Sequence, residues 1–278
     1  MSVQSGTERS VGYFARLSII VSAWARQLAS SSSQPHRAEA SRKLVRQTLL
    51  IFVTAALSVG VLMIWFDAPE IALMPPRGTA SLWPLRILTD FGKDTYVLLL
   101  VLVLLIGVTL TATAARGRAR QRLLAIGLRL QFLLLALSVP LAFGELLKWI
   151  VGRGRPFVGG QANPFNFVPF AGNEAHASLP SAHAITAFAL AFAVAALWPR
   201  LRGLMIAYAL AIAFTRLVLL AHHPSDVVAG ATIGVIGAMF VRYWFAVREL
   251  GFTVSASGAI SPVADQPLKG VAAGTSAP

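Results

Sequence analysis

Residues 95–115 read TYVLLLVLVLLIGVTLTATAA, twenty-one consecutive positions without a charged side chain. As an α-helix this stretch rises about 31 Å, which matches the hydrocarbon core of a bilayer at about 30 Å. Backbone polar groups in lipid must be satisfied within helices or closed barrels, and nothing in the stretch alternates with the period of a barrel strand. The segment therefore predicts a transmembrane helix.

Similar apolar stretches recur along the chain, and 56% of its 278 residues are hydrophobic. Only 13% are charged, against about a quarter in an average soluble domain. The five further stretches are residues 48–66, 130–149, 184–198, 203–221 and 227–245. Together these features predict an all-α membrane protein, a bundle of six transmembrane helices.

The formal net charge of +13 would suggest a nucleic-acid partner in a soluble protein, but here the basic residues fall between the apolar stretches. All of the basic clusters fall on one side of the membrane, which the positive-inside rule makes cytoplasmic. The clusters are Arg37, Arg42, Lys43 and Arg46, then Arg116, Arg118, Arg120 and Arg122, then Arg200 and Arg202, then Arg242 and Arg248. We expect both termini in the cytoplasm and no nucleic-acid partner.

The chain divides into three parts. Residues 1–47 form a cytoplasmic N-terminal segment, residues 48–250 the six-span domain, and residues 251–278, rich in Gly, Ala, Ser and Pro, a disordered tail. The first part has apolar residues at helical spacing, which suits an amphipathic helix on the membrane surface, a helix packed on a partner, or partial disorder. These apolar residues are Phe14, Leu17, Val21, Trp24 and Leu28.

Charges lie unusually deep at the outer ends of two predicted spans. Lys148 follows Glu145 near the end of the third span, and Arg216 lies inside the end of the fifth. Ionisable residues at such depth usually face a polar cavity or a partner. Lys148 alone is equally explained by snorkelling to the interface, and an ion pair with Glu145 is a structural alternative for Arg216.

Three outer segments carry polar groups at defined spacing. They read KWIVGRGRP at 148–156, PSAH at 180–183 and TRLVLLAHHPSD at 215–226. The arginine distribution places all three segments on the same side of the membrane, although that distribution was read independently of them. We therefore expect one site that combines the three segments.

These segments resemble the signature of the type 2 phosphatidic acid phosphatase superfamily over about residues 48–245. That signature is Lys, six residues and Arg-Pro, then Pro-Ser-Gly-His, then Ser-Arg, five residues, His, three residues and Asp. The spacings agree, but Ala182 replaces the usual Gly and Thr215 the usual Ser. The resemblance implies a membrane-bound lipid phosphatase with no cofactor and no metal.

The first group of site residues suits the binding of a phosphoryl group. A loose phosphoryl transition state spreads negative charge over three equatorial oxygens, so the site needs several fixed donors. Arg155 and Arg216 offer planar forks and Lys148 a compact charge. Ser181 precedes a predicted helix start, where its hydroxyl and the free N–H groups favour an anion.

The second group suits the chemistry itself. If span six is already helical at residue 222, His222 and Asp226 lie on one face, so that the carboxylate can fix the imidazole tautomer of a nucleophilic His222. His183 is the expected general acid, and base for water in the second step. Spacing alone leaves His223 open as the nucleophile, and the family register selects His222. Arg153 reaches either the phosphate or solvent.

Three other interpretations use the same residues. His and carboxylate near Asp226 are ordinary zinc ligands, although three cations aimed at one cavity repel a metal ion. A polytopic anion transporter would also need outer arginines, but it leaves the PSAH and His–Asp spacing unexplained. Some enzymes of the superfamily transfer phosphate instead of hydrolysing it.

The resemblance also limits the candidate substrates and the cellular location. Bacterial members act on undecaprenyl diphosphate, phosphatidate, phosphatidylglycerol phosphate and the phosphates of lipid A, and nothing in the sequence selects among these. A phosphate-binding site within the depth of the membrane suits a lipid phosphate that arrives by lateral diffusion. We expect a bacterial inner-membrane protein whose active site faces the periplasm.

Overall fold

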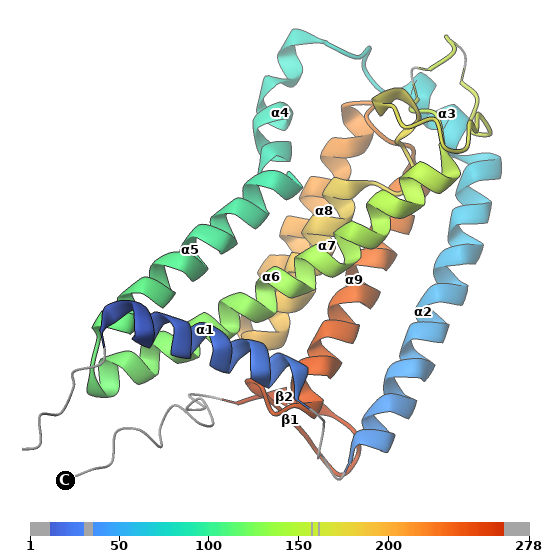
Figure 1. Cartoon of the computed structure of the whole chain (residues 1–278). Coiled ribbons are helices and arrows are strands. Elements are labelled where there is room, and N and C mark those ends of the chain that lie inside the picture. The colour runs from blue at the N-terminus through green and yellow to red at the C-terminus, as the bar shows by residue number, and fades with distance from the viewer. Residues whose placement is uncertain (1–11, 31–35, 157, 161, 264–278) are drawn as a thin grey trace, which may run out of the picture.

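The computed structural model describes residues 12–30, 36–156, 158–160 and 162–263, which are mostly helical (Figure 1). The long helices are α1 (Tyr13–Ala29), α2 (Arg37–Trp65), α5 (Asp94–Ala114), α6 (Gly117–Val151), α7 (Ala182–Leu197), α8 (Arg202–Val218) and α9 (Pro224–Val247). The short elements are α3 (Asp67–Leu73), α4 (Trp83–Asp90), the 3-10 turns η1 (Ala80–Leu82), η2 (Glu174–His176) and η3 (Pro199–Leu201), and the antiparallel strands β1 (Phe252–Val254) and β2 (Ile260–Pro262).

Within the described residues, five helical segments are long and apolar enough to cross a membrane. They are Arg37–Trp65, Ala80–Ala114, Gly117–Val151, Pro199–Val218 and Pro224–Val247. The remaining predicted span, residues 184–198 and the fourth in chain order, corresponds to α7, a shorter apolar helix of 16 residues. α7 packs against α6, α8 and α9 and therefore lies at the centre of the bundle.

Two glycines of α9 bring it close to α7. A Cβ on Gly230 would lie 2.5 Å from the carbonyl oxygen of Ser181, and one on Gly234 would lie 2.5 Å from that of Ile185. No larger residue fits at that separation without moving a backbone. The close approach also lets the Ser181 N–H donate to the carbonyl oxygen of Asp226 at 3.1 Å. The beginnings of α7 and α9 are thereby held together.

Two of the predicted spans begin earlier than expected. The first was expected at residue 48 and the third at residue 130, but α2 begins at Arg37 and α6 at Gly117. Their basic clusters therefore lie inside the helices, except for Arg116, which is the N-cap of α6. Arginine and lysine are good helix formers, and their long stems let the charge reach the interface from a helical position.

The N-terminal segment contains α1, a helix that packs on the bundle. Ile20 and Trp24 are buried against Ala112 of α5 and Leu124 of α6. Packing against neighbouring helices therefore accounts for its buried apolar residues. Residues 1–11 and 31–35 lie outside the described residues.

The predicted disorder from residue 251 is wrong for residues 251–263, where the β1–β2 hairpin forms. Phe252 of β1 is buried, and its ring lies 4.9 Å from that of Phe132 in α6, beside Phe245. A few alternating apolar residues thus anchor a segment whose average composition is poor in apolar residues. Residues 264–278 lie outside the described residues.

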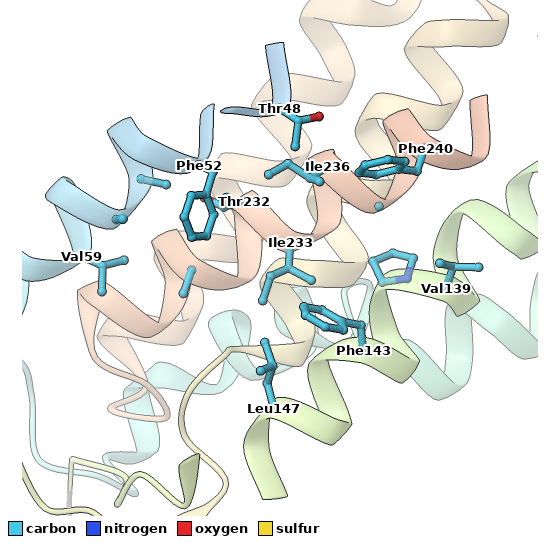
Figure 2. A pocket seen from close by; sticks show the side chains of 15 residues that line it. Thr48, Phe52, Val59, Val139, Phe143, Leu147, Thr232, Ile233, Ile236 and Phe240 are labelled. Carbon is cyan, nitrogen blue, oxygen red and sulfur yellow. The ribbon is translucent and has the colours of Figure 1, made fainter. Parts of the chain in front are cut away.

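α2 packs mainly on α9, and a groove of about 670 Å³ lies between α2, α6 and α9 (Figure 2). Its wall includes Phe52 and Val59 of α2, Phe143 of α6 and Ile233 of α9. None of the described residues that line it is charged. The groove is therefore suited to hydrocarbon and not to a phosphate group.

Candidate active site

The predicted site residues all lie at one end of the bundle. α6 and α8 run towards this end and α7 and α9 run away from it (Figure 1), so the last turns of the first pair meet the first turns of the second. Lys148 is in the last turn of α6 and Arg216 in the last turn of α8. Ser181 is the N-cap of α7, where its hydroxyl accepts from the Ala184 N–H at 3.5 Å. The structure therefore brings together segments that are distant in sequence.

His183, in the first turn of α7, is the point where these segments converge. Its half-buried imidazole interacts electrostatically with Arg216, His222, Lys148 and Arg155. These neighbours come from the end of α6, the loop after it, the end of α8 and the turn before α9. Three cations and two imidazoles thus lie near one another, and this concentration of positive charge suits an anion.

Arg216 is held by α4. Its Nη1 donates to Oγ1 of Thr89 at 2.8 Å, and the Thr215 hydroxyl donates to the same oxygen at 3.0 Å. Arg216 is buried, and its Nε has no hydrogen-bond partner among the described residues. The alternative pairing with Glu145 is wrong, because that carboxylate pairs with Lys148 at 2.6 Å.

The other two cations pair with acids that face solvent. Arg155 lies 2.7 Å from Glu174, whose side chain is 93% exposed, and Glu145, the partner of Lys148, is 57% exposed. Burial lowers the pKa of Arg155, and Glu174 opposes that shift. Exposed ion pairs contribute about 0–1 kcal/mol. Both acids can therefore swing away at little cost when an anion arrives.

The hydrogen bonds of His222 define its tautomer. Nδ1 lies 2.8 Å from the carbonyl oxygen of Ser178, which can only accept, so Nδ1 carries the proton. Burial lowers the pKa of His222 to about 4, which leaves the ring neutral at pH 7. A neutral ring protonated at Nδ1 has its lone pair on Nε2, so Nε2 is the ring nitrogen that is chemically able to act as a nucleophile.

Asp226 contributes in a different way from the one expected. α9 begins only at Pro224, so His222 precedes the helix, and its Nδ1 lies 3.8 Å from the Asp226 carboxylate. That separation is too long for a hydrogen bond but short for an electrostatic interaction. The predicted helical i, i+4 arrangement is therefore wrong, and the carbonyl of Ser178 fixes the tautomer.

The Asp226 carboxylate is fully buried and saturated with donors. It accepts from Nη1 of Arg153 at 2.5 Å, the Ser178 hydroxyl at 2.5 Å and the His223 N–H at 2.9 Å. Ser178 thus contacts His222 through its carbonyl and Asp226 through its hydroxyl. A single loop residue fixes the two side chains relative to each other.

Arg153 neither faces solvent nor joins the three cations near His183, and both expectations for it are wrong. Its side chain is 0% exposed. Besides Asp226, it donates to Asp67 at 2.7 Å, to Ser225 at 2.6 Å and twice to the carbonyl oxygen of Pro164. Because the loop after α6 folds back over it, Arg153 becomes the centre of a buried network.

Sequence reasoning missed several residues around the site. Asp67, the first residue of α3, is fully buried and accepts from the N–H and hydroxyl of Ser225 as well as from Arg153. Thr89 and Ser178 act on Arg216 and His222 in the same supporting way. A charged residue directly after an apolar span was the one available signal for Asp67, and nothing in the sequence linked it to residues 86 and 158 positions away.

Glu70 lies one helical turn after Asp67. It is buried, and neither carboxylate oxygen has a hydrogen-bond partner within the part of the chain that is described. Burial first, and then the charges of Asp67 and Asp226, raises its pKa to about 7. Among the described residues, no three His, Asp or Glu side chains come together in a way that could hold a metal ion.

A family model described as the PAP2 superfamily matches residues 129–249, which contain all three segments of the site. The chain is 31% identical over 217 residues to a lipid A 1-phosphatase of Rhizobium johnstonii, covering 77% of this chain and 87% of that protein. It is 33% identical over 193 residues to a lipid A 1-phosphatase of Rhizobium etli, covering 68% and 81%.

The chain belongs to the PAP2 superfamily. Membership of this superfamily and the two relatives make it a membrane lipid phosphatase, and thus a hydrolase. No solved structure matches the chain significantly.

Proposed function

We propose that this PAP2 phosphatase removes the 1-phosphate of lipid A through a phosphohistidine on His222. The observation that carries the mechanism is the hydrogen bond from Nδ1 of His222 to the Ser178 carbonyl, which leaves the Nε2 lone pair available on a ring that interacts electrostatically with Arg216 and Arg155. The substrate rests on the two relatives, both of which are lipid A 1-phosphatases aligned over more than four fifths of their length.

In the first step, Nε2 of His222 attacks phosphorus and the bond between phosphorus and the lipid oxygen breaks. Arg155, Arg216 and Lys148, with the N–H groups behind the Ser181 cap, bind the equatorial oxygens on which charge accumulates. His183, which takes up a proton as the phosphate dianion binds beside it, gives that proton to the departing oxygen. The imidazole becomes positively charged, and Asp226 at 3.8 Å stabilises that charge.

In the second step, water attacks the phosphohistidine. His183, now neutral, takes one proton from the water as the oxygen–phosphorus bond forms. The nitrogen–phosphorus bond breaks, phosphate leaves, and His222 regains its neutral form with Nδ1 still protonated. Each histidine ends in its starting state, so no cofactor is consumed.

We further propose that the site faces the outer leaflet of the inner membrane. Arginines gather at the opposite end of the bundle, at the start of α6 and between α7 and α8. By the positive-inside rule, that end is cytoplasmic. The chain lacks cysteine, so Ala80→Cys near the site and Ala119→Cys at the other end can be labelled in intact cells with an impermeant maleimide. Only Ala80→Cys should react, and the reverse pattern would overturn the orientation.

The substrate is tested with purified protein in detergent, offered lipid A, phosphatidate, undecaprenyl diphosphate and phosphatidylglycerol phosphate in parallel. His222→Ala serves as the background, and a chelator is included in duplicate reactions. We expect chelator-resistant release from position 1 of lipid A at the highest kcat/KM. Faster release from any other lipid would overturn the substrate assignment while leaving the phosphatase chemistry intact.

A further inference from the structure

A second cavity, of about 400 Å³, lies at the end of the bundle away from the active site. α8 and α9 both pack extensively on α7 but contact each other at few points, which leaves a space between them over α7. Its wall is apolar in the membrane-spanning part, with Phe188 and Phe192 of α7, Ile206 of α8 and Val235 of α9. Two arginines, Arg202 and Arg242, complete the lining at one end.

Arg242 is the unusual member of this lining. It lies five residues before the end of α9, is half-buried, and places its guanidinium 4.8 Å from the centre of the Phe192 ring. Its Nε is buried without a hydrogen-bond partner, and no carboxylate in the described part of the chain forms a salt bridge with it. Charges removed from water are normally paired, so this half-buried guanidinium, which stacks on Phe192 and has no carboxylate partner among the described residues, can take up an anion.

Arg202 supplies a second cation from a different helix. It is exposed in the first turn of α8, at the mouth of the cavity. The other side of Arg242 borders a smaller pocket of about 180 Å³ that also includes Lys43. The positive-inside rule accounts for basic residues near the cytoplasmic end of the bundle. It does not require two of them to line one cavity with apolar walls.

We infer that this cavity binds one anionic phospholipid, with the phosphate between Arg202 and Arg242 and an acyl chain along the apolar wall. Basic pockets between transmembrane helices are suited to anionic head groups. Val235 lies seven residues from Arg242, about 10 Å along the helix, which matches about eight methylenes of an extended chain. The lipid binds at the opposite end from the phosphatase site, so this site does not depend on the proposed substrate.

The test uses the full-length protein, delipidated in detergent and titrated with dioleoylphosphatidylglycerol or dioleoylphosphatidylcholine while native mass spectrometry counts bound lipids. The wild type should bind one phosphatidylglycerol in preference to phosphatidylcholine. The double variant Arg202→Gln, Arg242→Gln should weaken phosphatidylglycerol binding by about tenfold to thirtyfold. Ala195→Phe, which fills the α7 side of the cavity and keeps both arginines, should also weaken it.

The matched control is Arg118→Gln, Arg200→Gln, which removes the same charge from exposed positions outside the cavity. It should bind phosphatidylglycerol like the wild type. Equal loss in the control and the cavity variant would overturn the site in favour of general surface charge. Wild-type binding by the Arg202 and Arg242 double variant, equal affinity for both lipids, or a second copy of the chain seated in the cavity would also overturn it.

Discussion

Arg153 and Arg155 are two residues apart, yet they lie in opposite environments. Arg153 is fully buried and bonded to two buried carboxylates, whereas Arg155 pairs with one acid that is exposed to solvent. A guanidinium whose partners cannot move is part of the framework. A guanidinium whose partner can leave is available to a substrate. The burial of the acid, more than that of the arginine, separates the two roles.

The largest effect on stability is expected from Arg153→Met. This variant leaves Asp67 and Asp226 buried without their shared cation. Loss of one partner from a buried ion pair costs about 3–5 kcal/mol. Thermal unfolding in detergent should show a large decrease in Tm, and Arg200→Gln, an exposed change, should leave Tm unchanged. A wild-type Tm for Arg153→Met would contradict the framework role.

Arg155→Ala should have the converse effect. Its ion pair with Glu174 is exposed on the acid side, so stability should change by no more than about 1 kcal/mol. Removal of one donor to the transition state should lower kcat by about 10²- to 10³-fold. Steady-state kinetics and Tm measured on the same preparation separate the effect on catalysis from the effect on stability. A decrease in Tm as large as that of Arg153→Met would show that Arg155 also belongs to the structural framework.

Glu70→Gln tests the acidic side of the framework. The pKa of Glu70 is raised to about 7, so the folded protein resists its ionisation while the unfolded chain ionises near 4.5. Wild-type stability should therefore fall as pH rises from about 4.5 to above 7, by about 1–3 kcal/mol. Glu70→Gln should raise Tm at pH 8.5 and leave it unchanged at pH 4. An equal effect at both pH values would show that ionisation of Glu70 is not involved.

The smallest effect is expected from Glu174→Gln, which frees Arg155 from its exposed partner. Exposed pairs are worth little, so kcat/KM should rise by about twofold or stay constant. Kinetic assays at low ionic strength give the greatest sensitivity, because salt screens the pair. A large loss of activity would mean that Glu174 positions Arg155 and does not merely pair with it.

The sequence predicted the helices and the main site residues because both depend on local patterns. Apolar length predicted the spans, and the fixed spacing in three segments selected as candidates Lys148, Arg155, Ser181, His183, Arg216, His222 and Asp226, which the structure places at one end of the bundle. The orientation of His222 left no such pattern, because it depends on a backbone carbonyl 44 residues away. The role of Arg153 depends on Asp67, 86 residues away, in the same non-local manner. The β1–β2 hairpin was missed because a few apolar residues anchor it within a polar composition.

We propose that His222, held by Ser178 and distinct from its neighbour His223, carries the phosphoryl group. The most direct measurement is rapid quench of the enzyme with lipid substrate labelled with ³²P in the transferred phosphate, followed by peptide mapping under alkaline conditions that preserve phosphohistidine. We predict acid-labile label on His222 in the wild type, no label in His222→Ala, and retained label in His223→Ala if that variant folds. Label on His223, or full turnover by His222→Ala, would contradict the assignment of His222 as the nucleophile.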